Sequence, residues 1–329
     1  MTNTQCPMSR GPARANLGHW NLVIDHLKGV ALAGDEQRAG RVFGLRRLIA
    51  PCHLCPRDCG VDRLRGERGV CGVGEKAAVA SSGPHFGEEA CLVGRGGSGT
   101  IFLGGCNLRC VFCQNYDISH YPLGDERTPD EIAGLMLRLA VAGCENINVV
   151  TPTHVTHALA EAVVAARARG LSVPVVWNSS AYEKVETLRH LEGLVDIYMP
   201  DMKFDRPESA EAYCSASDYP EAARAAVGEM HRQVGDLAIE GGLARRGLLV
   251  RHLVMPGGGE ESRAILDFLA SLSPDTWVNV MGQYRPAGLV RPGGRWPELE
   301  RRPAAEEVAE ARRHARHLGL RLGRAPSPP

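Results

Sequence analysis

Residues 104–115 read GGCNLRCVFCQN and place Cys106, Cys110 and Cys113 in a C-x3-C-x2-C triplet directly after a short apolar run. Three closely spaced thiolates, with no equally spaced fourth, can hold a cubane iron–sulfur cluster and leave one iron unligated. A four-thiolate cluster only passes electrons, whereas an open metal position can bind and activate a substrate. The alternatives are a zinc knuckle, which normally shows paired C-x2-C arms, and buried structural cysteines, which have no reason to take this spacing. The triplet therefore predicts an enzyme with a [4Fe–4S] cluster.

The composition of the 329-residue chain is that of a globular protein, with 44% hydrophobic residues. Lys and Arg together number 38, as do Asp and Glu, so no overall field favours nucleic acid or an anionic membrane. No apolar run has the length of a membrane span, and the first residues lack the apolar stretch of a signal peptide. Eleven cysteines, an odd number, argue against a disulfide framework. We therefore expect a cytoplasmic protein with free thiols and no nucleic-acid or membrane partner.

From residue 99 onward, nearly continuous apolar runs alternate with helical segments, as expected for an α/β fold whose parallel strands are buried on both faces. The expected strands are Thr100–Gly105, Asn146–Thr151, Val173–Asn178, Val195–Asp201, Leu248–Met255 and Trp277–Met281. The expected helices are Pro129–Ala142, Val155–Arg169, Val185–Leu191, Pro220–Val234 and Glu260–Leu272. In α/β barrels the active site forms at the carboxyl ends of the strands, which is where the triplet falls.

We expect four regions along the chain. They are a disordered tail at 1–15, a helical, cysteine-containing N-terminal extension at 16–98, the α/β region at 99–285, and a C-terminal helix and tail at 286–329. Asn16–Ala50 is predicted to form one or two helices. Their apolar face consists of Leu17, Trp20, Val23, Ile24 and Leu27. Ala304–Leu318 has acidic residues early and basic residues late, which complements the helix dipole and predicts a solvated surface helix.

A second cysteine group lies in the extension. Cys52, Cys55, Cys59 and Cys71 have the spacing C-x2-C-x3-C-x11-C in a Gly-rich segment. Four thiolates suit a closed metal site, either structural zinc or a second cubane cluster. The arms are not two C-x2-C knuckles, which weakens the zinc interpretation. Because four thiolates leave no open position, we expect this centre to hold the N-terminal region over the barrel rather than to do chemistry.

Charged residues end two of the expected apolar strands. Asp201 and Lys203 are two apart on an extended chain and therefore point to the same side, and Arg251 ends the next strand. Charges in such positions are costly unless they are used. Asp201 can bind a cation or an amine, Lys203 can neutralise a carboxylate, and Arg251 can grip one with two hydrogen bonds. The alternative is a structural ion pair between Asp201 and one base.

The second expected strand ends in Thr151-Pro152-Thr153-His154. Thr151 and Thr153 offer hydroxyls to a ligand, although Thr153 can instead cap the following helix. His154 and His157 form no H-E-x-x-H motif, so we expect hydrogen-bonded loop residues rather than catalysts. A G-x-G-x-x-G string at residues 94–99 precedes a strand, whereas a dinucleotide site must follow one, so it predicts a turn.

Several stretches of the chain resemble the radical S-adenosylmethionine (SAM) superfamily, and within it the PflX-type homologues of pyruvate formate-lyase-activating enzyme. They lie between about Cys52 and Arg285 and read CHLCPRDCGVDR, GSGTIFLGGCNLRCVFCQNYDISH, NINVVTPTH, VDIYMPDMKFD, EMHRQVGD and VRHLVMPG. The resemblance implies a partial (β/α)6 TIM-like barrel, which the six expected βα units match. It also implies a [4Fe–4S] cluster on the triplet.

The same resemblance assigns residues to SAM. They are Phe112 beside the adenine, together with Asn178, Ser179, Asp201, Lys203 and Arg251. Met199 and Asp201 match a monovalent-cation site. Thr151 to Thr153 stand where many family members have a Gly-Gly-Glu that holds the methionine amine, so the amine ligand of this chain differs from the family pattern.

The implied activity is the reductive cleavage of SAM to a 5′-deoxyadenosyl radical, with electrons from a flavodoxin- or ferredoxin-type protein. By analogy the target is a polypeptide, such as the glycine of a glycyl-radical enzyme. Two alternatives remain at this stage. One is a radical SAM enzyme that acts on a small molecule. The other is a non-catalytic iron–sulfur protein that binds a cluster or transfers electrons.

Overall fold

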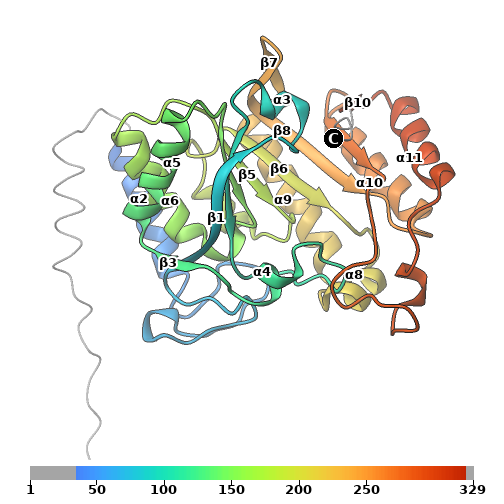
Figure 1. The fold of residues 1–329 in the computed structure, drawn as a ribbon, viewed down its shortest axis with the longest axis horizontal. Coiled ribbons are helices and arrows are strands. Elements are labelled where there is room, and N and C mark those ends of the chain that lie inside the picture. Colours follow the sequence, from blue (N-terminus) through green and yellow to red (C-terminus); the bar gives the residue numbers. More distant parts are fainter. Residues whose placement is uncertain (1–34, 324–329) are drawn as a thin grey trace, which may run out of the picture.

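Six neighbouring parallel strands form the centre of the computed structural model, which describes residues 35–323 (Figure 1). They are β2 (Ser98–Leu103), β4 (Ile147–Val150), β5 (Val175–Ser179), β6 (Ile197–Met202), β8 (Leu243–Leu253) and β9 (Trp277–Met281). The short β10 (Arg321–Leu322) continues the sheet in parallel beyond β9. These are the six expected strands, with ends shifted by a few residues, so the prediction of a partial (β/α)6 barrel is confirmed.

The expected helices connect these strands and cover the outer face of the sheet. They are α5 (Pro129–Val141), α6 (Thr156–Ala168), α7 (Val185–Arg189), α9 (Tyr219–Val234) and α10 (Gly259–Leu272). At the start of α5, the Thr128 side chain accepts from the Glu131 backbone N–H, and the Glu131 carboxylate accepts from the Thr128 N–H, a reciprocal cap. The C-terminal helix α11 (Ala305–His317) packs on α10. None of the helices in residues 35–323 has the length and apolarity needed to span a bilayer.

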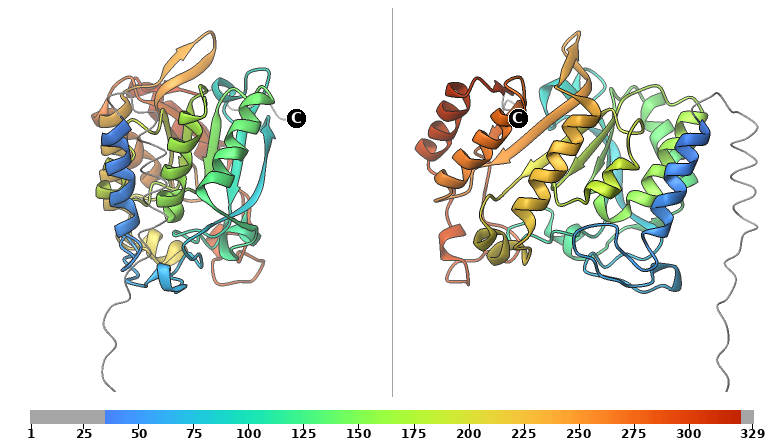
Figure 2. Two further views of the ribbon diagram at one scale, coloured as in Figure 1. Left: turned by 90° about the vertical axis from the view of Figure 1, so that its left-hand side faces the viewer. Right: turned by 180° about the vertical axis from the view of Figure 1, so that it is seen from behind.

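The N-terminal region contributes one described helix, α2 (Asp35–Arg47), which packs against α6 (Figure 2). The expectations for residues 1–34, among them the disordered tail and the apolar helix face from Leu17 to Leu27, lie outside the described residues. The segment that carries Cys52 to Cys71 is mostly irregular, with one short 3-10 turn, η1 (Arg63–Arg65).

Several short elements were not predicted. They are β1 (Ala77–His85), α3 (Ala90–Val93), α4 (Tyr116–His120), β3 (Asp125–Arg127), η2 (Thr153–Val155), α8 (Pro207–Cys214), β7 (Ala238–Glu240) and η3 (Pro297–Leu299). Strand β1 pairs antiparallel with β2 and with β3, although its sequence AAVASSGPH has few β-branched residues. The Gly-rich string at residues 94–99 forms a turn at residues 94–97 and then enters β2, as its place before a strand predicts.

A small apolar core fills the inside of the barrel near the N-terminal ends of the strands. Helix α3 contributes Cys91 and Leu92, which pack with Val176, Met199 and Leu249 of β5, β6 and β8. Helix α3 therefore closes this end of the barrel, at the top of Figure 1. The cysteine segment, α4 and α8 lie along the opposite edge, at the carboxyl ends of the strands. Parallel α/β barrels carry their chemistry at that end.

Candidate active site

The loop that follows β2 carries Cys106, Cys110 and Cys113. Cys106 and Cys110 are buried, and Cys113 is partly exposed. Arg109 takes a left-handed backbone conformation (φ 55°), which turns the chain between the first two cysteines. The Leu108 backbone N–H donates to Cys106 Sγ (3.4 Å), and the Ser119 hydroxyl donates to Cys113 Sγ (3.3 Å). The loop thus presents its sulfurs together and supplies hydrogen bonds to two of them.

The surroundings of these sulfurs disfavour isolated thiolates. Burial raises the pKa of Cys106 to about 12, and the neighbouring Cys110 and Cys113 add to the shift. A bound metal centre favours the thiolate over the thiol, because it binds the deprotonated sulfur and its positive charge offsets the cost of burying a negative one. Within residues 35–323, no set of three or more His, Cys, Asp or Glu side chains is arranged to hold a single metal ion. The triplet fits an iron–sulfur cluster through its thiol donors and its hydrogen bonds.

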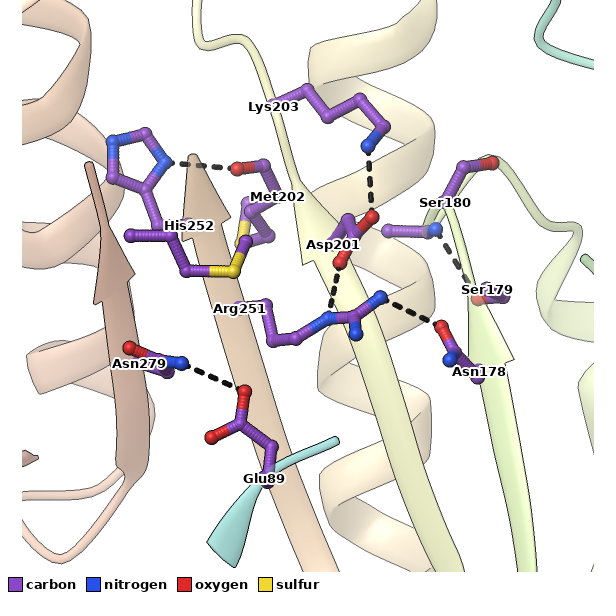
Figure 3. A network of polar contacts seen from close by, with 12 residues as sticks. Glu89, Asn178, Ser179, Ser180, Asp201, Met202, Lys203, Arg251, His252 and Asn279 are labelled. Carbon is purple, nitrogen blue, oxygen red and sulfur yellow. Dashed lines mark hydrogen bonds and ion pairs between the residues drawn. The ribbon is translucent and has the colours of Figure 1, made fainter. Parts of the chain in front are cut away.

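The structure brings together Asp201, Lys203 and Arg251 inside the barrel (Figure 3). Asp201 of β6 and Arg251 of β8 are register partners in neighbouring parallel strands. Arg251 Nε donates to Asp201 Oδ1 (2.7 Å), and Lys203 Nζ donates to Asp201 Oδ2 (2.8 Å). Arg251 Nη2 also donates to Asn178 Oδ1 (2.8 Å). The expected shared orientation is confirmed, and Asp201 pairs with both bases rather than with one.

These pairs fix the charges of the group. Burial acts to raise the pKa of Asp201, but the charges of Arg251 and Lys203 outweigh it and hold that pKa below its ordinary value. Burial acts to lower the pKa of Lys203, yet Asp201 outweighs it and raises that pKa. All three side chains are therefore charged at neutral pH. Lys203 and Arg251 form a fixed cationic pair that can hold a carboxylate.

Two acidic residues in this group were missed by the sequence analysis. Glu88 and Glu89 lie in the loop between β1 and α3 and reach into the barrel from its closed end. Glu88 Oε2 lies 3.7 Å from Arg251 Nη1, and Glu89 accepts a hydrogen bond from Asn279 Nδ2 (2.7 Å). Burial raises the pKa of Glu89. No sequence signal marks these two residues, because their loop precedes a four-residue helix with no periodic pattern.

Two buried polar groups inside the barrel have no hydrogen-bond partner among the described residues. They are the side-chain amide of Asn148 and the Oε2 atom of Glu88. Asn148 of β4 is in register with Val176, whose side chain belongs to the barrel core. A buried polar group without a partner costs about 1–3 kcal/mol, so these atoms point to a bound ligand or water inside the barrel.

Comparison with known proteins agrees with this geometry. Residues 100–269 match the radical SAM superfamily. The chain belongs to this superfamily. Uncharacterized protein MJ0674 of Methanocaldococcus jannaschii is 31% identical over 285 residues, which cover 84% of this chain and 78% of that protein. Uncharacterized protein MJ0808 of the same organism is 30% identical over 175 residues, which cover 46% of this chain and 49% of that protein.

As a radical SAM enzyme, the protein uses a [4Fe–4S] cluster and SAM, and it cleaves SAM. The residues that would hold the cluster are Cys106, Cys110 and Cys113. When bound, the cluster supplies the electron that breaks a carbon–sulfur bond of SAM. The cationic pair of Lys203 and Arg251 would hold the SAM carboxylate.

The other residues expected at the SAM site occupy two different environments. Phe112 is only 5% exposed, and its ring meets those of Phe204 and Tyr284 edge-on, at centroid distances of 6.0 and 5.8 Å. Thr151 has a left-handed backbone (φ 60°), and its N–H donates to the carbonyl of Asn178 (2.9 Å). It therefore lies beside the Arg251 group. The roles of Phe112 and Thr151 toward SAM stay predictions.

Thr153 and Ser179 point elsewhere. Both side chains hydrogen-bond the buried Glu183, whose carboxylate also accepts from Trp177 Nε1 (3.1 Å). The N-cap of α6 is Val155, so Thr153 does not cap that helix either. The structure thus separates Thr153 and Ser179 from the Arg251 group.

His154 and His157 are hydrogen-bonded structural residues, as expected, but they lie in η2 and α6 rather than in a loop. His154 Nε2 is 2.9 Å from the carbonyl oxygen of Gly104, and His157 Nε2 is 2.7 Å from that of Glu75. Burial lowers the pKa of His154 to about 4 and that of His157 to about 3, so both rings are neutral at pH 7. Each ring ties the segment after β4 to a distant stretch of backbone.

Replacing Lys203 or Arg251 with alanine is expected to weaken SAM binding and to leave the iron content unchanged. Loss of a charge-assisted partner of a carboxylate costs about 1.5–3 kcal/mol, or about 10- to 150-fold in affinity. Equilibrium binding of SAM to the anaerobic holoenzyme measures the effect. Arg263→Ala, in an exposed pair with Glu310 on the outer helices, is the matched control. Wild-type SAM affinity in both test variants would show that the two residues are purely structural.

Glu183 is expected to make the stability of the protein fall as pH rises. Burial raises the pKa of Glu183 to about 7, whereas the unfolded value is about 4.3. Between these values the folded state holds a proton that the unfolded state has lost, so the free energy of unfolding decreases by up to about 4 kcal/mol. Glu183→Gln should remove this slope. Urea unfolding of both proteins across this pH range measures it, and parallel curves would show that Glu183 is ionised throughout.

Proposed function

We propose that this radical SAM enzyme acts on a polypeptide, as a PflX-type homologue of pyruvate formate-lyase-activating enzyme. The observation that carries the proposal is a set of exposed apolar side chains beside the cysteine loop. Tyr121 is 55% exposed, Leu123 52% and Leu289 42%. Monomeric proteins seldom gather large apolar side chains on their surface without a binding role. We call these three residues the apolar rim.

Backbone contacts tie the apolar rim to the catalytic loop. The Leu289 N–H donates to the carbonyl of Val111, between the second and third cysteines of the triplet (2.8 Å). Tyr121 and Leu123 follow α4, the first helix after the triplet, and the Tyr121 ring meets that of Tyr116 edge-on at 6.0 Å. A polypeptide that docks on the rim would therefore lie next to the cluster loop.

The inside of the barrel offers hydrogen-bond acceptors and donors to a backbone that enters it. The unpartnered Asn148 amide can pair with a peptide group, and the Glu88 carboxylate can accept from a peptide N–H. Extended peptides are commonly held by main-chain hydrogen bonds of this kind, with apolar contacts for affinity. An apolar rim outside and an unpartnered buried amide inside together favour a polypeptide loop over a free metabolite.

Each part of this site has a task in the proposed reaction. Lys203 and Arg251 orient SAM by its carboxylate, and Asp201 holds both cations in place. The barrel wall excludes water and positions the target hydrogen within about 3–3.5 Å of the reacting atom. We propose a flavodoxin- or ferredoxin-type protein as the electron donor. The Met199 side chain packs in the barrel core, and each carboxylate oxygen of Asp201 already accepts a hydrogen bond from Lys203 or Arg251. Neither observation tests the bound monovalent cation expected at these two residues, which stays a prediction.

Isotope transfer tests the substrate class. Cells grown on Cα-deuterated glycine provide an extract, which is divided into a polypeptide fraction and a small-molecule fraction. Incubation of each with the reduced enzyme and unlabelled SAM should give deuterated 5′-deoxyadenosine from the polypeptide fraction only. Transfer from the small-molecule fraction alone would overturn the proposal.

Variants of the apolar rim provide a second check. The double variant Tyr121→Ser/Leu123→Ser should lower deuterium transfer several-fold while SAM cleavage without substrate is unchanged. Val141→Ser, at a 90% exposed position at the end of α5, is the matched control. Equal transfer by the two variants would contradict a docking role for the rim.

A further inference from the structure

We propose that Cys52, Cys55, Cys59 and Cys71 hold a second iron–sulfur cluster, which passes electrons to the cluster of the catalytic triplet. The proposal rests on membership of the radical SAM superfamily and is independent of the polypeptide substrate proposed above. It changes the role expected from the sequence, where four thiolates suggested only a structural centre.

The four cysteines line one small cavity in the N-terminal segment. Cys52 and Cys55 are buried, whereas Cys59 and Cys71 are partly exposed. Close packing surrounds Cys59: a Cβ at position 69 would lie 2.6 Å from its sulfur, so the site requires glycine there. The chain between Cys59 and Cys71 thus folds back to bring the fourth sulfur to the other three.

A backbone N–H already donates to one of the four sulfurs. The Val70 N–H donates to Cys59 Sγ (3.4 Å). Such hydrogen bonds stabilise thiolates and help to set the reduction potential of a cluster. A donor fixed by the backbone favours the anionic form of the Cys59 sulfur.

The positive charges around the cavity have no carboxylate partner among residues 35–323. The Arg63 guanidinium is 1% exposed and donates to the carbonyls of Gly74 and His154. Arg57 donates to the carbonyls of Asn107, Leu108 and Cys214, among others. No carboxylate in the described part of the chain lies within ion-pair distance of Arg57 or Arg63. A buried charge without a counterion is costly, and a metal centre with four thiolates supplies the missing negative charge.

The cavity lies directly against the catalytic loop. A Cβ at Gly105, the residue before Cys106, would lie 2.5 Å from the carbonyl oxygen of Cys71. The Asn107 side chain lines the cavity together with Cys55, and its Nδ2 donates to the carbonyl of Tyr182 (2.8 Å). The turn at residues 105–108, which carries Cys106 of the catalytic triplet, therefore lies in contact with the second cysteine group.

This adjacency favours an iron–sulfur cluster over zinc. Zinc has no redox chemistry, whereas a four-thiolate iron–sulfur cluster is an electron carrier. The partly exposed Cys59 and Cys71 give an external donor access to the second cluster. In the proposed step the second cluster loses one electron and the catalytic cluster gains it. An external one-electron donor then reduces the second cluster again.

Metal analysis of a triple variant tests the site. Cys106→Ser/Cys110→Ser/Cys113→Ser protein, isolated anaerobically, should retain about four iron and four sulfide per chain. After dithionite reduction it should give the electron paramagnetic resonance signal of a reduced cluster. Stoichiometric zinc with no iron, or no metal at all, would overturn the proposal.

A second variant tests electron transfer. Cys59→Ser/Cys71→Ser protein should keep the catalytic cluster and should cleave SAM several-fold more slowly than wild type when reduced flavodoxin is the donor. Cys144→Ser, at a buried cysteine outside both groups, is the control. An unchanged rate in the double variant, with the second cluster shown to be missing, would overturn the electron-transfer role. If the double variant does not fold, the triple variant still decides whether the cluster exists.

Discussion

Replacement of Cys106 by alanine is expected to reduce SAM cleavage to the background rate. Only two thiolates of the triplet would remain, and neither Cys110 nor Cys113 can replace the lost ligand on the far side of the Arg109 turn. Without the Cys106 thiolate, the protein should lose the iron of the catalytic cluster. It should retain the iron at the second cysteine group. Chromatographic detection of 5′-deoxyadenosine after dithionite reduction measures the effect.

Cys144→Ala is the matched control for this experiment. Cys144 is also a buried cysteine, but it lies before β4 and outside both groups. The control should keep wild-type activity, and thermal unfolding of both variants should show that each is folded. A folded Cys106→Ala protein that cleaves SAM at the wild-type rate would contradict the assignment of the triplet.

Replacement of Asp201 by alanine is expected to destabilise the folded protein by about 3–5 kcal/mol, because removing one partner of a buried ion pair leaves an uncompensated charge. Here two cations, Lys203 and Arg251, lose the carboxylate between them. Anaerobic urea unfolding of the holoenzyme measures the change. Asp125→Ala removes an exposed pair with Arg127 (2.7 Å) and should cost no more than about 1 kcal/mol.

The effect of Asp201 also has a defined pH dependence. Its pKa in the folded protein lies below the ordinary value, so its stabilising contribution is present above the unfolded pKa of about 3.9. The contribution is lost as pH falls through the folded pKa. The difference between wild type and Asp201→Ala should therefore be constant from about pH 6 to 8. If Asp201→Ala lowers the free energy of unfolding by no more than the Asp125→Ala control does, solvent already compensates the charges of Lys203 and Arg251.

The sequence predicted those parts of the protein that follow from local chemistry and regular periods. The continuous apolar run at Trp277–Met281 predicts strand β9, and the structure has a strand with these bounds. Asp201 and Lys203 were assigned to one side of their strand from the period of two, and the structure joins them through a hydrogen bond. Cysteine spacing identified both cysteine groups without any knowledge of the fold.

The remaining parts of the site depend on contacts between distant segments. Glu88 and Glu89 lie outside every predicted strand and helix, and they reach the barrel because β1 folds back on β2. Asn148 interrupts an apolar strand, but nothing local shows that its amide faces the inside of the barrel. Thr153 follows the second barrel strand as predicted, yet the buried Glu183 from the next loop draws its hydroxyl away. Short elements and side-chain orientations of this kind are decided by tertiary packing.

The central claim is that the carboxyl ends of these strands hold a reducible cluster at which SAM is bound and cleaved. Anaerobic reconstitution of the full chain, reduction with dithionite and addition of SAM test it most directly. We expect methionine and 5′-deoxyadenosine in equal amounts, with formation dependent on reductant. A reconstituted protein that contains the reduced catalytic cluster and forms neither product would contradict the account.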